Sequence, residues 1–199
     1  TIRLAKELGS RFIRCFSFWK DDNYTDEYLI SKMKECEPDL IANGLTMLIE
    51  ADPAVNLTNA QSLSRVLKKL NSPNFKAIWD PGNDIYDPLK EIPYPDGYNY
   101  IKPFIAHMHL KDAVREGDKT IGVALGTGQV DYKGQFRALL ESSYDGFIVM
   151  ETHYKKGSNI DEELLKKPMG SKFSQLGYES TEECLINLDR LIDEVVNSF

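Results

Sequence analysis

The sequence predicts an α/β fold with a parallel sheet that is closed or strongly curved. Segments typical of strands and helices alternate along the 199 residues, and each strand segment is followed by a mostly helical connection. Because parallel strands need a long crossover between them, repeated β-α units indicate a parallel sheet. Four successive strand segments also end in an acidic or histidine side chain. Four such groups can meet at one point only if the sheet closes or curves strongly.

Five segments have the apolar, β-branched and aromatic residues that are typical of buried strands. The first, "RFIRCFSF", is rich in aromatic residues, and the others are short apolar runs such as "LTMLIE" and "GFIVMET". The predicted strands cover residues 11–18, 45–50, 75–80, 104–112 and 146–152.

The connections between these strands carry helix signals. One predicted helix ends at Gly44 and contains Pro38, a residue that usually ends or kinks a helix. Another has leucine and valine recurring at helical spacing, and the last opens with a Ser/Thr-x-x-Glu capping pattern. The predicted helices cover residues 25–44, 58–70, 97–102, 132–143 and 181–199.

Three stretches are predicted to be irregular. "PGND", after residue 80, is read as a breaker, and the Gly-rich residues 115–131 are read as a loop. The polar residues 154–180 are predicted to be a long loop with a helical turn at 160–166. No Gly-rich phosphate turn follows the first strand, which argues against an open dinucleotide-binding sheet.

Composition and charge exclude several classes of protein. Net charge is −7, which argues against a general nucleic-acid binder, since such proteins carry a basic surface. No apolar run reaches the length of a membrane span, which is about 18 residues, and the first residues do not resemble a signal peptide. The cysteines are Cys15, Cys36 and Cys184, an odd number at wide spacing, as expected for reduced thiols. We therefore expect a cytoplasmic protein without nucleic-acid or membrane partners.

The strand ends carry the strongest functional signal. Four predicted strands carry an acidic or histidine residue at or near their carboxyl ends: Glu50, Asp80, His109 and Glu151. One polar residue at a strand end would mean little, because strands often end where the chain meets solvent. Four in series predict convergence, because the carboxyl ends of parallel barrel strands share one rim, where active sites lie. Three carboxylates and an imidazole suit Mn²⁺ or Mg²⁺, with Co²⁺ or Zn²⁺ as alternatives, and the lack of a thiol argues against structural zinc.

The motifs around these four residues resemble a known family. The series "LIE", "WDPGN", "HMHLKD" and "VMET" is similar to the xylose-isomerase-like TIM-barrel superfamily, and within it to the sugar phosphate isomerase/epimerase family. The resemblance covers the chain from about residue 8 to its end. It implies a (β/α)8 TIM barrel of which the chain holds roughly strands 4 to 8, with the N-terminal strands 1 to 3 missing. We accordingly expect residues 1–199 to form a single domain, the C-terminal part of a barrel.

The resemblance also implies how the four residues act. Glu50, Asp80, His109 and Glu151 would hold the divalent ion, and the two glutamates would also serve as acid and base. The expected activity is that of a metal-dependent sugar or sugar-phosphate isomerase or epimerase, with proton transfer next to a carbonyl through a metal-stabilised enediolate. A metal-dependent dehydratase or hydrolase of the same superfamily, inosose-dehydratase-like or endonuclease-like, is one alternative. A non-catalytic sugar-binding barrel is another.

Two positions are matched to substrate contacts by this resemblance. Arg115 stands six residues after His109, where the epimerases have a substrate-binding arginine. Asn83 stands three residues after Asp80, where the epimerases and the DNA-repair relatives have histidine. That departure leaves the sugar open and weakens the endonuclease alternative, which needs more histidines than the three in this chain.

Three further residues are candidates for the substrate site. His107 shares a strand face with His109, so it either contacts substrate or fills the barrel interior. Lys111 either forms an ion pair with Asp112 or reaches a substrate hydroxyl or phosphate. His153 follows the last predicted ligand by two residues and is a candidate for the rim of the site.

Other side chains have alternative placements. Arg14 either orients ligands and substrate or faces the helix layer, and Trp19 is a candidate for lining a sugar pocket. Trp79 is expected to pack between sheet and helices. The loop "KKPMGSKFS" at 166–174 is either a lid that clamps a phosphate or a solvated segment. The expected partners are a small-molecule sugar or sugar phosphate and further copies of the chain in a homo-oligomer.

Overall fold

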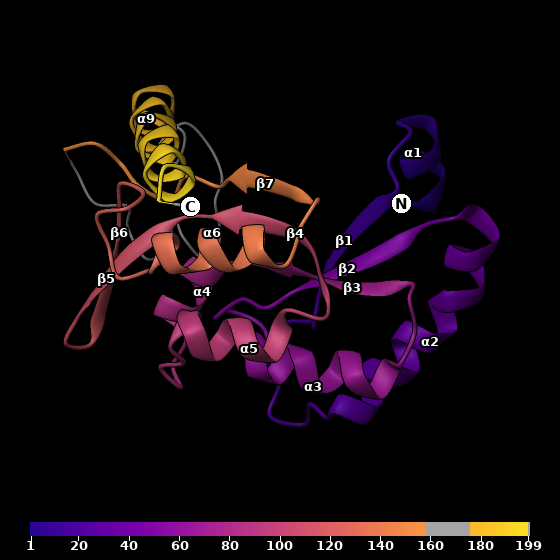
Figure 1. The fold of residues 1–199 in the computed structure, drawn as a ribbon. Helices are drawn as coiled ribbons and strands as arrows, with labels where there is room; N and C mark the ends of the chain where they lie inside the picture. Colours follow the sequence, from indigo (N-terminus) through magenta and orange to yellow (C-terminus); the bar gives the residue numbers. More distant parts are fainter. Residues whose placement is uncertain (158–175, 199) are drawn as a thin grey trace.

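The computed structural model describes residues 1–157 and 176–198, and a five-stranded parallel sheet forms its centre. Every neighbouring pair of strands in this sheet is parallel, so the predicted α/β architecture is confirmed. The five strands coincide with the five predicted segments and curl as part of a barrel would (Figure 1). In sheet order they are β1 (Phe12–Phe16), β2 (Thr46–Glu50), β3 (Phe75–Trp79), β4 (Ile105–Leu110) and β7 (Phe147–Met150).

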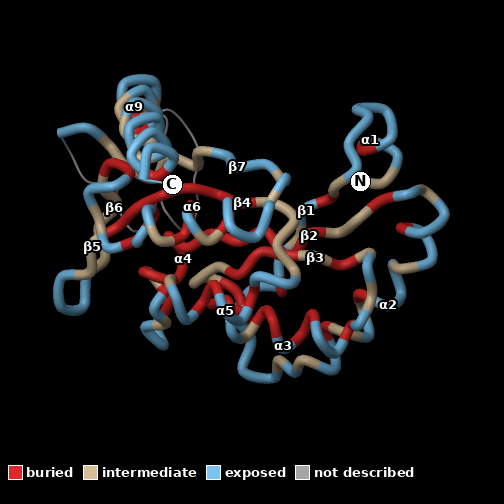
Figure 2. Tube along the Cα trace, viewed as in Figure 1, coloured by how far each residue is buried: buried red, intermediate tan, exposed pale blue. Residues whose placement is uncertain are grey.

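Helices pack along one face of the curled sheet (Figure 1). Figure 1 shows α2, α3 and α5 along the lower face, with α6 in front of β4. Figure 2 shows the buried residues concentrated in the strands and in the sheet-facing side of these helices. The helices are α1 (Ile2–Glu7), α2 (Asp26–Asn43), α3 (Ala60–Leu70), α4 (Pro81–Tyr86), η1 (Pro93–Gly97), α5 (Tyr98–Ile101), α6 (Tyr132–Glu141) and α9 (Gly177–Val196).

Helix α3 illustrates how local sequence and packing agree. The side chain of Asn59 accepts a hydrogen bond from the backbone N–H of Ser62, and the Ser62 side chain in turn caps the backbone of Asn59. The apolar stripe that begins at Leu63 is buried against the sheet. The helix predicted over 58–70 is therefore confirmed.

Helix α2 runs without interruption through Pro38, which the sequence had marked as a complication. It begins after Thr25, whose side chain accepts from the N–H of Tyr28, and it ends at Gly44. Gly44 has φ of 63°, a left-handed conformation that favours glycine at a helix end.

The Gly-rich stretch 115–131, predicted to be a loop, is partly an antiparallel hairpin. Strands β5 (Asp112–Glu116) and β6 (Lys119–Val123) pair with each other and turn at Gly117, where φ is 62°. The prediction of a loop over the whole stretch was wrong, because charged residues and glycines hide the alternating pattern of two short strands. The rest of the stretch leads into α6.

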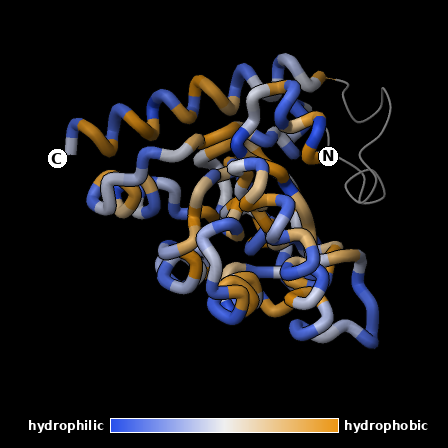
Figure 3. Tube along the Cα trace, turned by 90° about the vertical axis from the view of Figure 1, so that its right-hand side faces the viewer, coloured by the Kyte–Doolittle hydropathy of each residue, from blue (hydrophilic) through white to orange (hydrophobic). Residues whose placement is uncertain are grey.

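Two other boundaries differ from the sequence prediction. "PGND" does not break the chain but opens α4, since Pro81 is at the first turn of a helix, where proline is well tolerated. Helix α9 begins at Gly177, four residues before the predicted start. It lies along the edge of the molecule with hydrophilic and hydrophobic residues alternating along its length (Figure 3).

Two expectations lie outside the described residues: the helical turn at 160–166 and the lid role of the loop at 166–174. Within the residues that the structure describes, no helix has both the length and the apolar character needed to cross a bilayer.

Glu91 gives the fold a pH dependence that can be tested. Its carboxylate accepts hydrogen bonds of 3.0 and 3.1 Å from the backbone N–H of Gln61, at the start of α3. Burial, followed by the charges of Asp87 and Asp96, raises the pKa of Glu91 from 4.5 to about 7 despite the hydrogen bond. Between these two values the folded state binds more protons than the unfolded state, so the free energy of unfolding falls as pH rises through this window.

We expect Glu91→Gln to remove this part of the pH dependence. Urea denaturation of the wild type and the variant at pH 4.5 and pH 8 measures it. The wild type should lose more stability than the variant over this interval. Equal losses in both proteins would contradict the assignment to Glu91.

Candidate metal centre

Four side chains from the carboxyl ends of β2, β3, β4 and β7 meet at one rim of the sheet. Glu50 is the last residue of β2, Asp80 and Glu151 directly follow β3 and β7, and His109 is the next-to-last residue of β4. One ligand atom from each lies within 4.8 Å of the others. The predicted convergence of these four residues is confirmed.

The chemistry of this cluster fits a divalent cation. Glu50, Asp80 and His109 are only 1%, 3% and 8% exposed, so little water reaches their polar atoms. Gathering three carboxylates in a buried place is costly unless cations compensate their charge. Carboxylate oxygens and one imidazole nitrogen form a donor set that suits Mg²⁺ or Mn²⁺ and accommodates Zn²⁺ or Co²⁺.

Glu50 is held from two sides. The Nε of Arg14 lies 2.5 Å from Glu50 Oε2, which places Arg14 on the site side of the sheet and not in the helix layer. Asn83 Nδ2 donates to the carbonyl of Ala51 at 2.9 Å and to Glu50 Oε1 at 3.4 Å. Asn83 therefore positions Glu50, and its contact with substrate stays a prediction.

Lys111 reaches into the centre of the cluster. Its Nζ lies 2.8 Å from Asp80 Oδ2 and 2.8 Å from Glu151 Oε2, and its side chain is 3% exposed. Burial by itself would lower the pKa of Lys111, but the negative charges of Asp80, Glu151 and Glu50 outweigh burial and raise it above its usual value. Lys111 is therefore a permanent cation of the site.

Of the two alternatives for Lys111, the ion pair with Asp112 was wrong, since Lys111 pairs with Asp80 and Glu151. Successive side chains of an extended chain point to opposite sides, so Lys111 turns to the cluster and Asp112 turns away. The carboxylate of Asp112 accepts four backbone N–H groups and so organises the segment before α6. Their donors are Ala113, Gly126, Gly128 and Val130.

The remaining titratable groups respond to the same charges. Burial disfavours protonation of His109, but hydrogen bonds with Glu151 and Glu50 raise its pKa to about 9. Burial would raise the pKa of Glu151, yet Lys111 and His109 hold it well below its usual range, so Glu151 is ionised. Burial, with the nearby Lys111 charge, lowers the pKa of His153 to about 4, so its imidazole is neutral at pH 7.

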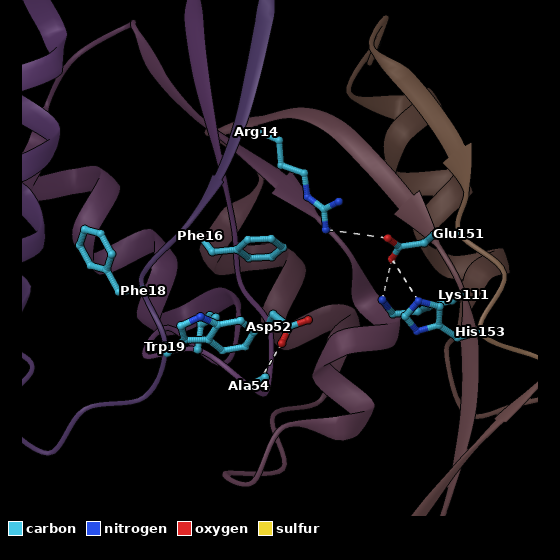
Figure 4. A pocket seen from close by; sticks show the side chains of 10 residues that line it. Arg14, Phe16, Phe18, Trp19, Asp52, Ala54, Lys111, Glu151 and His153 are labelled. Carbon is cyan, nitrogen blue, oxygen red and sulfur yellow. Dashed lines mark hydrogen bonds and ion pairs between the residues drawn. The ribbon is translucent and has the colours of Figure 1, made fainter. Parts of the chain in front are cut away.

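A pocket of about 550 Å³ adjoins the cluster (Figure 4). Lys111, Glu151 and His153 lie together on one side of it. Arg14 faces Glu151 from β1, which is at the opposite edge of the sheet from β7. Aromatic side chains form the other side, and Asp52 lies between the two groups. These aromatic residues, which we call the aromatic wall, are Phe16, Phe18 and Trp19.

The structure thus brings Glu151, Lys111 and His153 to the pocket, and it places two other predicted residues elsewhere. His107 is half-buried beside the cluster, with its ring centroid 5.3 Å from that of His109 in an edge-on arrangement. The guanidinium of Arg115 donates to the carbonyl oxygens of Asp84, Ile85 and Asp87 around the end of α4. Substrate contacts by His107 and Arg115 stay predictions.

The two tryptophans lie where the sequence suggested. Trp19 lines the pocket and is 71% exposed. Trp79 is 2% exposed and packs against Tyr98, with ring centroids 5.4 Å apart, between the sheet and α5.

Sequence reasoning missed two residues of the site. Asp52 lines the pocket, and its only signal was its place two residues after Glu50. Tyr132 is fully buried, and its hydroxyl accepts from the N–H of Lys111 at 3.1 Å and donates to the Lys111 carbonyl at 2.6 Å. No local pattern marks Tyr132, because its partner is 21 residues away.

We expect Tyr132→Phe to lower the free energy of unfolding by about 1–3 kcal/mol. The variant keeps the ring but leaves the buried N–H and carbonyl of Lys111 without a partner, and a buried unpaired polar group has a cost of this size. Urea denaturation checks this value. A loss below about 0.5 kcal/mol would mean that the hydroxyl does not hold Lys111.

Comparison with known proteins agrees with this geometry. A family described as "Xylose isomerase-like TIM barrel" matches residues 1–180. No curated protein matches the chain.

Several solved structures are similar in fold. An L-ribulose 3-epimerase is 14% identical with a TM-score of 0.70, covering 100% of this chain and 66% of its own. A xylose isomerase-like TIM barrel protein from Mycobacterium smegmatis, in complex with magnesium, is 17% identical with a TM-score of 0.68, covering 98% and 65%. The probable 3-DHS dehydratase AsbF from Bacillus anthracis is 18% identical with a TM-score of 0.63, covering 83% and 64%.

At this level of identity the similarity shows the fold, and the chain spans about two thirds of the length of these proteins. The parallel sheet, the cluster at its carboxyl rim and the match over residues 1–180 agree with one another. The chain belongs to the xylose isomerase-like TIM barrel family.

Proposed function

We propose that this protein is a divalent-metal-dependent isomerase or epimerase that acts on a sugar or sugar phosphate. One observation carries the proposal: Glu50, Asp80, His109 and Glu151 converge beside a pocket of about 550 Å³. A pocket of this volume, with an apolar wall and a few polar groups at one end, suits a small organic substrate. The epimerase among the structural relatives acts on a sugar, and it supports the substrate class by analogy.

The ion would be held by these four residues, with Mn²⁺ or Mg²⁺ as the first choice. When bound, it supplies a Lewis acid for the carbonyl and hydroxyl oxygens of the substrate. The protein's own part is proton transfer at the carbon next to that carbonyl. Glu151 is the better placed of the two glutamates to take this proton, since it lines the pocket and its side chain is 26% exposed, against 1% for Glu50.

The other residues orient and shield the reaction. Lys111 keeps the carboxylate of Glu151 ionised, and the ion pairs with Arg14 and Lys111 hold that carboxylate in place at the pocket. Glu50, held by Arg14 and Asn83, is the proposed second acid–base group, which returns a proton that reaches it through water or substrate hydroxyls. The neutral imidazole of His153 and the carboxylate of Asp52 line the pocket and are the proposed contacts for substrate hydroxyls.

A metal-dependent dehydratase is the second candidate. The similarity to a probable dehydratase supports it, because elimination also begins with removal of a proton next to a carbonyl. A dehydratase releases water from the substrate and an isomerase or epimerase does not, so one experiment separates the two activities.

The experiment incubates the purified protein with Mn²⁺ and a panel of ketoses, aldoses and their phosphates in D₂O. Proton NMR that shows deuterium next to the carbonyl, together with an isomer or epimer, supports the proposal. Loss of water in place of an isomer selects the dehydratase. Tight sugar binding without exchange for any substrate would contradict both and select a non-catalytic sugar-binding barrel.

Trp19→Ala tests the pocket as the substrate site. Trp19 lines the pocket but is 71% exposed, so its removal should barely affect the fold. We expect KM to rise about five- to tenfold with little change in kcat, since the lost apolar contact is worth about 1 kcal/mol. Tyr178→Ala, at an aromatic residue that is 77% exposed and outside the pocket lining, is the control. An unchanged KM in Trp19→Ala would place the substrate elsewhere.

Four expectations on the whole protein stay predictions alongside this proposal. They are a single domain over residues 1–199, a cytoplasmic location, the lack of nucleic-acid and membrane partners, and a homo-oligomeric state.

A further inference from the structure

Lys111 is an unusual neighbour for a metal centre, because it already contacts two of the proposed ligands. Its ammonium group lies 2.8 Å from a carboxylate oxygen of Asp80 and 2.8 Å from one of Glu151. Carboxylates that bind a metal usually also accept hydrogen bonds from neighbouring groups, which orient them. Here the neighbouring group is the positively charged ammonium of Lys111, which contacts both carboxylates.

The fold holds Lys111 in this place from three directions. The hydroxyl of Tyr132 fixes both its backbone N–H and its carbonyl. Gly82 leaves room for its side chain, since a Cβ at Gly82 would lie 2.4 Å from Lys111 Cγ and 2.5 Å from the Lys111 carbonyl oxygen. Asp80 and Glu151 hold the charged end. The position of the ammonium group is thus built into the packing of α4 and α6.

The charges of the site indicate what this ammonium does. Three carboxylates bring three negative charges, while Arg14 and Lys111 bring two positive ones. A ligating histidine is neutral. One divalent ion therefore turns a net charge of about −1 into about +1, and a second divalent ion would meet an excess of positive charge.

We propose that Lys111 is a resident cation of the metal centre, which competes with the ion for Asp80 and Glu151. It limits the site to one divalent ion and keeps the affinity for that ion moderate. This inference rests on the proposed function only in assuming that the cluster binds a metal. Lys111 is a positioning and selectivity-determining residue in this account, not a group that reacts with substrate.

Metal titration of Lys111→Met tests the inference without any measurement of activity. Isothermal calorimetry and elemental analysis with Mn²⁺ give affinity and stoichiometry for the wild type and the variant. Lys133→Met is the matched control, because Lys133 pairs with Glu194 at the exposed surface between α6 and α9. We expect one Mn²⁺ in the wild type and the control, and at least tenfold tighter binding in Lys111→Met, with a second, weaker ion.

The outcomes separate this inference from the proposed function. A wild type that binds no Mn²⁺ would contradict the metal centre itself. One ion in both proteins, with equal or weaker affinity in Lys111→Met, would overturn only the role of Lys111.

Circular dichroism of Lys111→Met with and without Mn²⁺ provides the folding control for this titration. If Lys111→Met is unfolded without metal by circular dichroism, Mn²⁺ should restore its fold, because the ion replaces the missing charge. Failure of Mn²⁺ to restore the fold would overturn the inference.

Discussion

Glu151→Gln is expected to lower metal affinity and to abolish turnover, with a fall in kcat/KM of about 10³-fold or more. The change removes a charge that is proposed to bind the ion and the proposed base at the pocket, and general acid–base catalysis alone supplies a rate factor of about 10²–10⁴. The glutamine also leaves Lys111 with Asp80 as its nearest partner. Mn²⁺ content and deuterium exchange into the substrate measure the two losses separately.

A matched control for this variant is Glu141→Gln, which neutralises an exposed carboxylate at the end of α6. It should leave metal content and exchange unchanged. If Glu151→Gln behaved like the control, the assignment of the site would be wrong.

Gly82→Ala is expected to have the largest effect on stability of the changes considered, with a loss of about 3 kcal/mol in the free energy of unfolding. The added Cβ would meet the side chain and the carbonyl oxygen of Lys111 at 2.4 and 2.5 Å, and the carbonyl cannot turn away because Tyr132 holds it. Lys111 or α4 must therefore move. Metal affinity should change as well, because Asp80 lies two residues away.

The control for this change is Gly177→Ala, where an added Cβ meets nothing within 4 Å. Alanine there should be neutral or slightly stabilising at the start of α9. Urea denaturation of both variants measures the difference. A Gly82→Ala protein as stable as Gly177→Ala would show that Lys111 does not pass beneath α4.

The parts of the site that follow from strand periodicity could be predicted from the sequence. Glu50, Asp80, His109 and Glu151 end strands that are parallel, so their meeting at one rim follows from the sheet alone. Successive side chains of a strand point to opposite faces, so Trp79 was expected to face the helices because its neighbour Asp80 faces the site.

The parts that depend on connections could not be predicted in the same way. Adjacency in sequence suggested a pair between Lys111 and Asp112, whereas alternation along the extended chain separates them. Tyr132 meets Lys111 only because the segment between them folds as a hairpin and a turn held by Asp112. The placement of Arg115 against the end of α4 depends on the same hairpin.

The most direct test of the central claim is anomalous X-ray diffraction from crystals of the protein grown with Mn²⁺. We expect one strong peak, with oxygen atoms of Glu50, Asp80 and Glu151 and a nitrogen of His109 at about 2.0–2.4 Å from it. The absence of a peak at this rim of the sheet, or a peak held by other residues, would contradict the account.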